Sequence, residues 1–209
     1  MIQIDLFSDV ICPWCYIGKR RMERALKSRE ELSVEITWRA FQLNPEMPST
    51  GIPREQYLIL KFGDKTRAKA IYDNIQKAGD TEGLSFNFDN ITHTPNTVLA
   101  HRLIGWSQKQ NKSEDIVENL FKAYFVDGRN IGSMEILREI AIDTNLDANS
   151  FDEHFSNDDD LQEIHLETRY AYENGITGVP CFIFNKSFSI TGAQEPEAFL
   201  PLLDIKPDP

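Results

Sequence analysis

The chain has 209 residues, of which 41% are hydrophobic and 26% charged, as expected of a folded globular protein that buries a substantial core. Its formal net charge of -11 at pH 7 argues against a nucleic-acid partner, because binding to phosphates requires a basic surface. The sequence shows no apolar stretch of membrane-spanning length and no secretory leader, which predicts a cytoplasmic protein without a membrane partner. Composition leaves the oligomeric state open.

The first predicted strand leads directly to a pair of cysteines. Apolar and polar residues alternate from Ile2 to Leu6, as in a strand, and Pro13 is suited to the first position of a helix. Cys12 is therefore expected at or near the N-cap, where unpaired N–H groups and the helix dipole favour a thiolate. Cys15 follows about one helical turn later on the same face, close enough to form a disulfide with Cys12.

A Cys-x-x-Cys pair is typical of a redox-active disulfide, but also of half a zinc site. The chain contains three cysteines and no second close pair of Cys or His ligands, whereas a structural zinc site usually has four ligands. The position of the pair between a strand and a helix favours redox chemistry over zinc binding or a purely structural role. Because permanent disulfides are rare in the cytoplasm, the pair is expected to cycle between dithiol and disulfide.

The middle of the chain is predicted to be mostly helical. The helix that carries the cysteines is expected to extend from Trp14 to about Ser28, and a second strand follows from Val34 to Ala40. A link rich in Pro and Gly begins at Asn44. We then expect helices at about 54 to 62, 64 to 78, 95 to 110, 114 to 126, 133 to 144, 149 to 156 and 159 to 174, with a short extended piece at 84 to 88. This series predicts a helical subdomain inserted in an α/β frame.

The chain is predicted to end in a β-hairpin and a short helix. Pro180 opens a strand, and a turn at Asn185 leads into a second strand that ends at Ile190. A helix from about 195 to 203 follows, and Pro201 is expected to distort or end it. The element order is therefore strand, helix, strand, helical block, two strands and helix.

Short motifs occur along this series of elements. They are Ser8-Asp9 with Cys12-Pro13-Trp14-Cys15-Tyr16-Ile17-Gly18, Asn96-Thr97 through Ala100-His101-Arg102, Gly178-Val179-Pro180, and Gly192-Ala193-Gln194. In this order they resemble the DsbA family of thioredoxin-like oxidoreductases, in particular its FrnE-like branch, which is related to 2-hydroxychromene-2-carboxylate isomerases and kappa-class glutathione transferases. The resemblance implies an α/β, thioredoxin-like fold with a large all-helical insertion. Residues 1–45 and 158–209 would form a discontinuous thioredoxin-like domain, and residues 46–157 the inserted helical subdomain.

The resemblance also implies roles for residues around the cysteines. Pro180 takes the position of the cis-proline that lies beside the cysteine pair in thioredoxin-like folds, so the Val179 backbone would pair with an incoming chain as an added strand. The active-site cleft would be lined by Pro13, Trp14, Val179, Pro180, Asn96, Gly192, Ala193 and Gln194. A role at the start of a helix explains Asn96 equally well.

Three further residues near these motifs are candidates for auxiliary roles. Cys181 directly follows Pro180, and we expect it to be a buried small hydrophobic residue; an alternative disulfide partner and a third metal ligand are its other possible roles. His93 and His101 flank the start of the second motif. Either histidine could support the Cys12 thiolate, although a hydrogen-bonded structural histidine is the simpler interpretation.

These features together predict a thiol-disulfide oxidoreductase that acts on protein or small-molecule disulfides. Cys12 would be the exposed nucleophile and Cys15 the buried resolving thiol. The expected partner is a disulfide- or thiol-containing protein, a peptide or glutathione; neither a metal nor a cofactor is expected, and glutathione is the candidate co-substrate. A glutathione-dependent isomerase or transferase is one alternative, against which Cys12 argues because those relatives carry Ser there. A zinc-binding or redox-sensing protein is the other, and the natural substrate and the direction of the redox reaction stay open.

Overall fold

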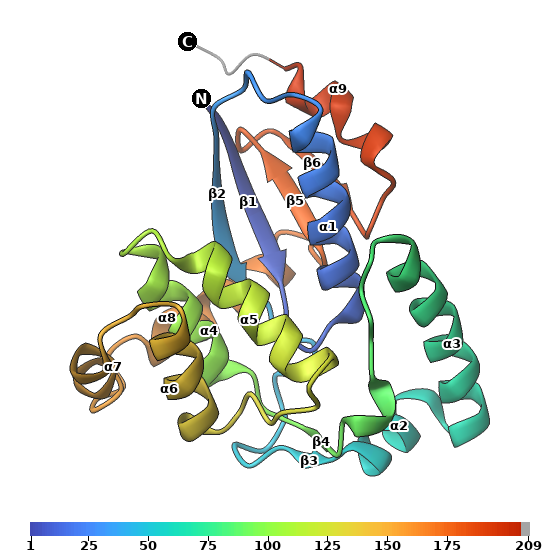
Figure 1. The fold of residues 1–209 in the computed structure, drawn as a ribbon, viewed down its shortest axis with the longest axis vertical. Helices are drawn as coiled ribbons and strands as arrows, with labels where there is room; N and C mark the ends of the chain where they lie inside the picture. The colour runs from blue at the N-terminus through green and yellow to red at the C-terminus, as the bar shows by residue number, and fades with distance from the viewer. Residues whose placement is uncertain (206–209) are drawn as a thin grey trace.

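The computed structural model describes residues 1–205, and a four-stranded sheet lies at its centre (Figure 1). The strand order is β2-β1-β5-β6, with β1 (Ile2–Ser8) parallel to β2 (Val34–Ala40) and antiparallel to β5 (Cys181–Phe184). Strand β6 (Phe188–Thr191) pairs with β5 in antiparallel fashion. Because β1 is a central strand, the cysteine turn that follows it starts near the middle of the sheet, at the end where β1 finishes.

Helix α1 (Pro13–Lys27) covers the part of the sheet formed by β1 and β5 (Figure 1). Its apolar side chains recur at helical spacing, and Ile17 and Met22 are buried in the core. The 3-10 turn η2 (Pro196–Ala198) contacts α1 and leads into the short helix α9 (Leu200–Leu203). The helix with the cysteines is thus held between the sheet and the C-terminal segment.

A smaller unit follows β2 and lies near the N-terminal end of α1 (Figure 1). Strands β3 (Ile52–Pro53) and β4 (His93–Thr94) pair in antiparallel fashion. Between them the chain forms α2 (Arg54–Phe62), α3 (Lys65–Thr81) and the 3-10 turn η1 (Phe88–Asn90). Helix α3 contacts α1, so this unit packs beside the helix that carries the cysteines.

The remaining helices pack on the other side of α1 and on β2. They are α4 (Val98–Gln108), α5 (Ser113–Phe125), α6 (Met134–Asp143), α7 (Ala148–His154) and α8 (Leu161–Glu173). Helices α4 and α8 contact β2, while α5 and α6 contact α4. Buried side chains of the sheet, of α1 and of α4 to α7 belong to one continuous apolar core, whereas Ile164 and Ala171 of α8 belong to two smaller clusters.

The structure confirms the expected α/β frame with a helical insertion, but the insertion also contains the short β3–β4 pair, which was not predicted. The other differences are smaller. The helix expected at 95 to 110 begins at Val98, because the Asn96 side chain accepts a hydrogen bond from the Val98 N–H and so occupies the turn before the helix. The piece expected to be extended at 84 to 88 forms no strand, and its last residue, Phe88, begins η1. Local alternation of apolar residues here reflects packing against the core rather than pairing with another strand.

The C-terminal helix expected at 195 to 203 is split into η2 and α9. Pro201 lies in the first turn of α9 instead of near a helix end, because a missing N–H costs no hydrogen bond in a first turn. The division into a discontinuous domain, 1–45 and 158–209, and an inserted subdomain, 46–157, stays a prediction. Residues 206–209 of that division lie outside the described residues.

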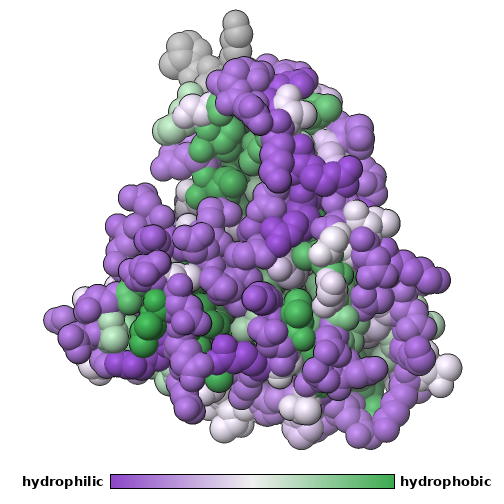
Figure 2. Space-filling view, in the orientation of Figure 1, coloured by the Kyte–Doolittle hydropathy of each residue, from purple (hydrophilic) through white to green (hydrophobic). Residues whose placement is uncertain are grey.

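Hydrophilic residues cover most of the face of the molecule seen in Figure 2. None of the helices within residues 1–205 has the length and apolar character needed to span a bilayer.

Candidate active site

Cys12 is held at the N-terminus of α1 by the turn that follows β1. Its backbone has the extended conformation of an N-cap residue (φ -95°, ψ 110°), and Pro13 is the first residue of the helix. The Cys12 N–H donates to the Asp9 carbonyl at 2.9 Å, and the Cys15 N–H donates to the Cys12 carbonyl at 3.0 Å. Among the described residues no side chain caps this helix, so its first N–H groups and its dipole act on the Cys12 sulfur.

Both thiols of the pair are free and buried in this structure. Cys12 is only 5% exposed, so the prediction of an exposed nucleophile was wrong. Its sulfur is covered because the thiol points at the loop before β5, where it donates to the Val179 carbonyl at a distance of 3.7 Å. Trp14, between the cysteines, is 38% exposed and forms the solvent-facing edge of the site.

Cys15 is more deeply buried than Cys12, and its burial affects the protonation of its thiol. Burial raises the pKa of the Cys15 thiol well above its ordinary value of 9.0, and the neighbouring Cys12 sulfur raises it further. The nearby Ser8 hydroxyl and Asp9 N–H lower this pKa but do not reverse the shift. Cys15 is therefore a protonated thiol at neutral pH.

The loop before β5 approaches α1 closely. The Val179–Pro180 peptide bond is cis, and the Gly192 N–H donates to the Pro180 carbonyl at 2.7 Å. Gly18, on α1, makes this approach possible, because a Cβ atom at that position would lie 2.7 Å from Cγ of Pro180. The role of Gly18 was missed in the sequence, although an isolated glycine inside a predicted helix is a signal for close packing.

The loop Gly192-Ala193-Gln194 is attached to the same helix by an arginine. Arg21 of α1 donates from Nη1 to the Ala193 carbonyl at 2.6 Å, and its Nη2 lies 2.8 Å from Glu195 Oε1. The Gln194 side chain is exposed and donates to the Thr191 carbonyl at 2.9 Å. The structure thus brings this loop, Pro180 and α1 together, as the family resemblance implied.

Asn96 and His93, which the sequence also suggested for this region, make contacts with the backbone of the helical insertion. The Asn96 amide donates to the Met47 carbonyl at 2.7 Å while its Oδ1 accepts from the Val98 N–H at 2.9 Å. Nε2 of His93 lies 2.7 Å from the Thr50 carbonyl. Both side chains therefore fix the segment between β2 and β3 against the start of α4.

His101 reaches the cysteine turn through a buried carboxylate. Nε2 of His101 lies 3.5 Å from Asp9 Oδ1 and 3.2 Å from the Phe41 carbonyl. Oδ2 of Asp9, which is fully buried, accepts from the Leu43 N–H at 2.8 Å. Asp9 thus ties the turn before Cys12 to α4 and to the chain after β2.

Cys181 is buried in a second apolar cluster, together with Phe7, Phe41 and Ala171. Burial raises the pKa of the Cys181 thiol, and the Thr191 hydroxyl, which donates to its sulfur at 3.7 Å, opposes this shift. Cys12 and Cys15 belong to the main core cluster instead. Within residues 1–205, no group of three or more His, Cys, Asp or Glu side chains is placed to hold a metal ion.

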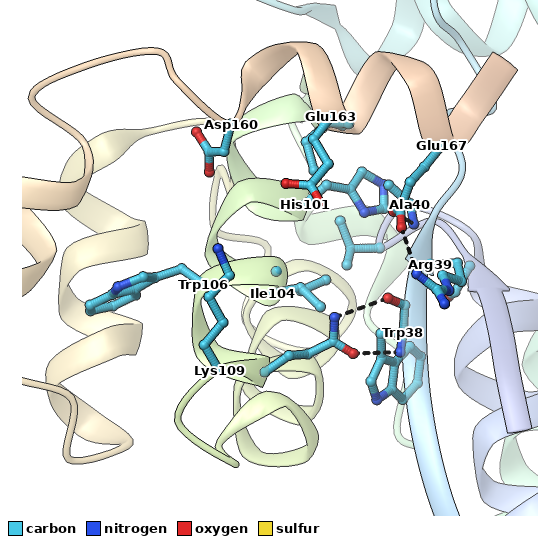
Figure 3. Close-up of a pocket in the computed structure, with 15 residues that line it drawn as sticks. Trp38, Arg39, Ala40, His101, Ile104, Trp106, Lys109, Asp160, Glu163 and Glu167 are labelled. Carbon is cyan, nitrogen blue, oxygen red and sulfur yellow. Dashed lines mark hydrogen bonds and ion pairs between the residues drawn. The ribbon is translucent and has the colours of Figure 1, made fainter. Parts of the chain in front are cut away.

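A cavity of about 160 Å³ lies behind the cysteine turn, between β2, α4 and α8 (Figure 3). Its wall includes Ser8, the last residue of β1, and His101, which approaches Asp9. Figure 3 shows that both apolar and charged side chains line this cavity. Trp38 and Ile104 are among the apolar ones, and Lys109, Glu163 and Glu167 are among the charged ones.

Comparison with known proteins places these features in a family. The protein YwbO of Bacillus subtilis (strain 168) is 30% identical over 205 residues, which cover 95% of this chain and 94% of YwbO. The solved structure of a probable DsbA oxidoreductase from Streptomyces coelicolor is 29% identical with a TM-score of 0.87, and the match covers 97% of this chain and 88% of that one. The cytosolic disulfide reductase DsbM from Pseudomonas aeruginosa, solved with GSH, is 16% identical with a TM-score of 0.67 and 97% coverage of both chains, which shows a shared fold.

The thioredoxin-like fold implied by the sequence motifs is confirmed by these matches. The model of the DSBA-like thioredoxin domain matches residues 3–204, which include the cysteine turn, the helical insertion and the hairpin after Pro180. The resemblance to the DsbA family is likewise confirmed, and the chain belongs to the family of DSBA-like thioredoxin domains.

Proposed function

We propose that this protein is a thiol-disulfide oxidoreductase in which Cys12 is the nucleophile and Cys15 the resolving thiol. The observation that carries the proposal is the Cys12 thiol at the N-terminus of α1, 3.7 Å from the Val179 carbonyl, with the buried Cys15 behind it. Membership of the DSBA-like family, whose members include oxidoreductases, supports the same reaction class.

The proposed reaction proceeds through two exchanges of sulfur–sulfur bonds. The Cys12 thiolate attacks one sulfur of the substrate disulfide, that bond breaks, and the first substrate thiolate leaves with the electron pair. The Cys15 thiolate then attacks the Cys12 sulfur, which releases the second substrate thiolate and forms the Cys12–Cys15 disulfide. The substrate has gained two electrons and the protein has lost them, and the reverse sequence oxidises a dithiol.

The raised pKa of Cys15 fits the order of these steps. While Cys12 is free, burial and the adjacent Cys12 sulfur keep Cys15 protonated, so it does not compete as the first nucleophile. In the mixed disulfide Cys12 can no longer carry a charge or a thiol proton, so the part of the Cys15 pKa shift caused by Cys12 disappears. Cys15 is then easier to deprotonate at the step that needs its thiolate.

The proposed partners are disulfide- or thiol-containing proteins, peptides or glutathione. The structure of DsbM with GSH supports glutathione as a candidate, because that protein shares this fold. We also propose a cytoplasmic location, in which reducing conditions would let the pair cycle. The residues that line the cleft in this proposal are Pro13, Trp14, Val179, Pro180, Gly192, Ala193 and Gln194.

The test compares cysteine variants in reduction of a protein disulfide and in trapping of a mixed disulfide. Replacing Cys12 by Ser should abolish exchange, whereas Cys15→Ser should accumulate a mixed disulfide on Cys12, detected by mass spectrometry. Cys181→Ser is the matched control, because it removes a buried thiol outside the pair and should keep the exchange activity. Unchanged exchange in Cys12→Ser would refute the proposal.

The two alternative functions, a glutathione-dependent isomerase and a zinc-binding protein, predict different experimental results. A glutathione-dependent isomerase would turn over an aromatic substrate at an undiminished rate after Cys15→Ala, because that chemistry needs no resolving thiol. A zinc-binding protein would contain stoichiometric metal when freshly purified, which elemental analysis would detect. Either result would replace disulfide exchange as the assigned activity.

A further inference from the structure

Arg21 of α1 is a largely buried side chain that binds two other parts of the chain. It is 9% exposed, and its Nε donates at 3.0 Å to Glu82 Oε1, at the C-terminal end of α3. Its Nη1 donates to the Ala193 carbonyl at 2.6 Å, and its Nη2 lies 2.8 Å from Glu195 Oε1. Each of the three guanidinium nitrogens thus has an acceptor, and two of these acceptors belong to the segment after β6.

The loop 192–194 is attached to the rest of the protein mainly through Arg21 and Pro180. The Gly192 N–H donates to the Pro180 carbonyl at 2.7 Å. The bonds of Gln194 stay within the loop and the end of β6, because its N–H and its side chain donate to carbonyls of residues 192 and 191. Within residues 1–205, the hydrogen bonds of this loop to other elements are therefore those with Pro180 and Arg21.

The Pro180 carbonyl is adjacent to the carbonyl that faces the nucleophile. Because proline has no N–H, its carbonyl is its only backbone hydrogen-bonding group, and Gly192 fixes it. The neighbouring Val179 carbonyl accepts from the Cys12 thiol at 3.7 Å. Since peptide units are planar, fixing the Pro180 carbonyl limits how far the Val179 carbonyl can turn. A continuous series of contacts thus leads from Arg21 to the Cys12 sulfur.

We propose that Arg21 is a positioning residue, which holds the loop 192–194 against Pro180 and thereby orients the Val179 carbonyl towards the backbone of a substrate joined to Cys12. The inference rests on the proposed function, because that joined state is its mixed disulfide. There the carbonyl can accept a hydrogen bond from a backbone N–H of an extended substrate. A mixed disulfide with a peptide should therefore be stabilised by Arg21, whereas one with a thiol that lacks amides should not.

Arg24, one turn later on α1, offers a closely matched control. The Glu82 side chain is only 1% exposed and accepts from both arginines, at 3.0 Å from Arg21 and 2.9 Å from Arg24. Replacing either arginine by Gln leaves this buried carboxylate with one cationic partner, so neither variant creates an unpaired buried charge. Of the two, it is Arg21 that binds the Ala193 carbonyl.

The test measures how two neutral thiols compete for Cys12 at equilibrium. The Cys15→Ser protein, which cannot resolve a mixed disulfide, is equilibrated with the thiol and disulfide forms of N-acetyl-Gly-Cys-Gly-amide and of 2-mercaptoethanol. Mass spectrometry gives the ratio of the two adducts on Cys12, and the same competition for free N-acetylcysteine amide gives the reference ratio. Relative to that reference, the protein should favour the peptide by about 5- to 20-fold, the effect of one or two hydrogen bonds.

Arg21→Gln in the same background should bring the ratio close to the reference, and Arg24→Gln should keep the preference for the peptide. A purely structural role of Arg21 would lower the stability of the protein without changing the ratio, because both adducts are attached to the same sulfur. An unchanged ratio in Arg21→Gln, or an equal loss in Arg24→Gln, would overturn the inference.

A second variant decides if Arg21→Gln does not fold. The Glu195 side chain is 63% exposed, so Glu195→Lys should fold, and its new cation repels the Arg21 guanidinium from the loop. It should lower the preference for the peptide, and an unchanged preference would overturn the inference.

The outcomes separate this inference from the proposed function. If Cys12 forms both adducts without a preference for the peptide, the oxidoreductase proposal stands and the role of Arg21 is rejected. If Cys12 forms neither adduct, both are rejected. A preference that depends on Arg21 and not on Arg24 supports the positioning role.

Discussion

Cys12 and Cys15 are neighbours on α1, yet they differ in what their sulfur atoms contact. The Cys12 thiol faces a backbone carbonyl at the entrance formed by Val179, whereas Cys15 is enclosed by the core and by the cysteine turn. Burial alone would make both thiols inert, but the N-terminus of α1 favours charge at Cys12. The pair therefore combines one sulfur at a helix N-terminus with one that holds its proton.

The raised pKa of Cys15 leads to a prediction about the resolution step. In a mixed disulfide between Cys12 and a small thiol, the rate of attack by Cys15 should rise about tenfold per pH unit below the Cys15 pKa. The sign follows from burial, which favours the neutral thiol, so the thiolate fraction is small at neutral pH and grows as protons are removed. Stopped-flow measurement of thiol release between about pH 6 and 8 checks this, and a flat profile would contradict a buried, protonated Cys15.

The sequence predicts the cysteine pair because its chemistry depends on short spacing and on the element that carries it. Asp9 and His101 are different, since their approach at 3.5 Å joins residues from the first turn and from α4. Asn96 likewise donates a hydrogen bond to the Met47 carbonyl, and no local sequence pattern predicts that contact. Residue roles that require two distant segments are read only from the folded chain.

Helix α1 is the element on which the site depends, and it is fixed on two sides. Gly18 lets the Pro180 loop approach on one side. On the other side Glu118 of α5 accepts from the Tyr16 hydroxyl at 2.6 Å and from Lys19 at 3.0 Å, and it also pairs with Arg20. Displacement of α1 at either contact would move Cys12 relative to Val179.

Gly18→Ala should destabilise the protein despite the higher helix propensity of alanine. A Cβ atom 2.7 Å from Pro180 forces a shift that costs about 1 to 3 kcal/mol, more than the gain of about 1 kcal/mol from the helix. Denaturant unfolding measures the free energy, and disulfide exchange by Cys12 should slow as well. Gly105→Ala in α4 is the control, because no atom lies within 4 Å of its added Cβ and it should be neutral or stabilising.

Glu118→Gln should weaken the contact between α5 and α1. Burial would raise the pKa of Glu118, but the Tyr16 hydroxyl together with Lys19 and Arg20 holds it below its ordinary value. A lowered pKa in the folded state contributes stability at neutral pH, and this contribution is lost as the pH falls through that pKa. We expect a loss of about 1 to 2 kcal/mol in the free energy of unfolding at pH 7. Unfolding titrations at several pH values check this, and a difference that persists in acid would contradict it.

Elements could be predicted from the sequence where their ends have local signals. Gly63, with a φ of 88°, follows α2, and Asp64 caps α3 by accepting from the Arg67 N–H at 2.8 Å. The split between η2 and α9 was not predicted, because the packing of Phe199 into the core decides it. Sequence patterns thus located most helices, while tertiary contacts fixed their ends.

At the scale of the whole molecule, the helical block and the sheet share one core. The continuous cluster includes Ile4 and Leu6 of β1, Ile17 of α1 and Leu120 and Phe121 of α5. The sequence predicted the insertion from the order of elements, but it could not predict this sharing, because apolar periodicity shows which face is buried and not its partner. The site is therefore supported by the insertion as well as by the sheet.

A shared core predicts that the sheet and the helical block unfold together. Hydrogen exchange followed by mass spectrometry should give similar free energies of opening for peptides from β1 and from α5 under global unfolding conditions. Coincident denaturation midpoints for the two peptides would support one cooperative unit. Loss of protection in α5 at a denaturant concentration that leaves β1 protected would instead show two independent units.

The hydrogen bond from the Cys12 thiol to the Val179 carbonyl has a consequence for turnover in the proposed reaction. In the resting dithiol the carbonyl is occupied by the protein's own sulfur, but a mixed disulfide has no S–H to donate, so the acceptor becomes available to a backbone amide of the substrate. After the Cys12–Cys15 disulfide has been reduced again, the Cys12 thiol competes for the carbonyl once more. The Val179 carbonyl is therefore available to a substrate backbone only while the Cys12 sulfur is part of a disulfide.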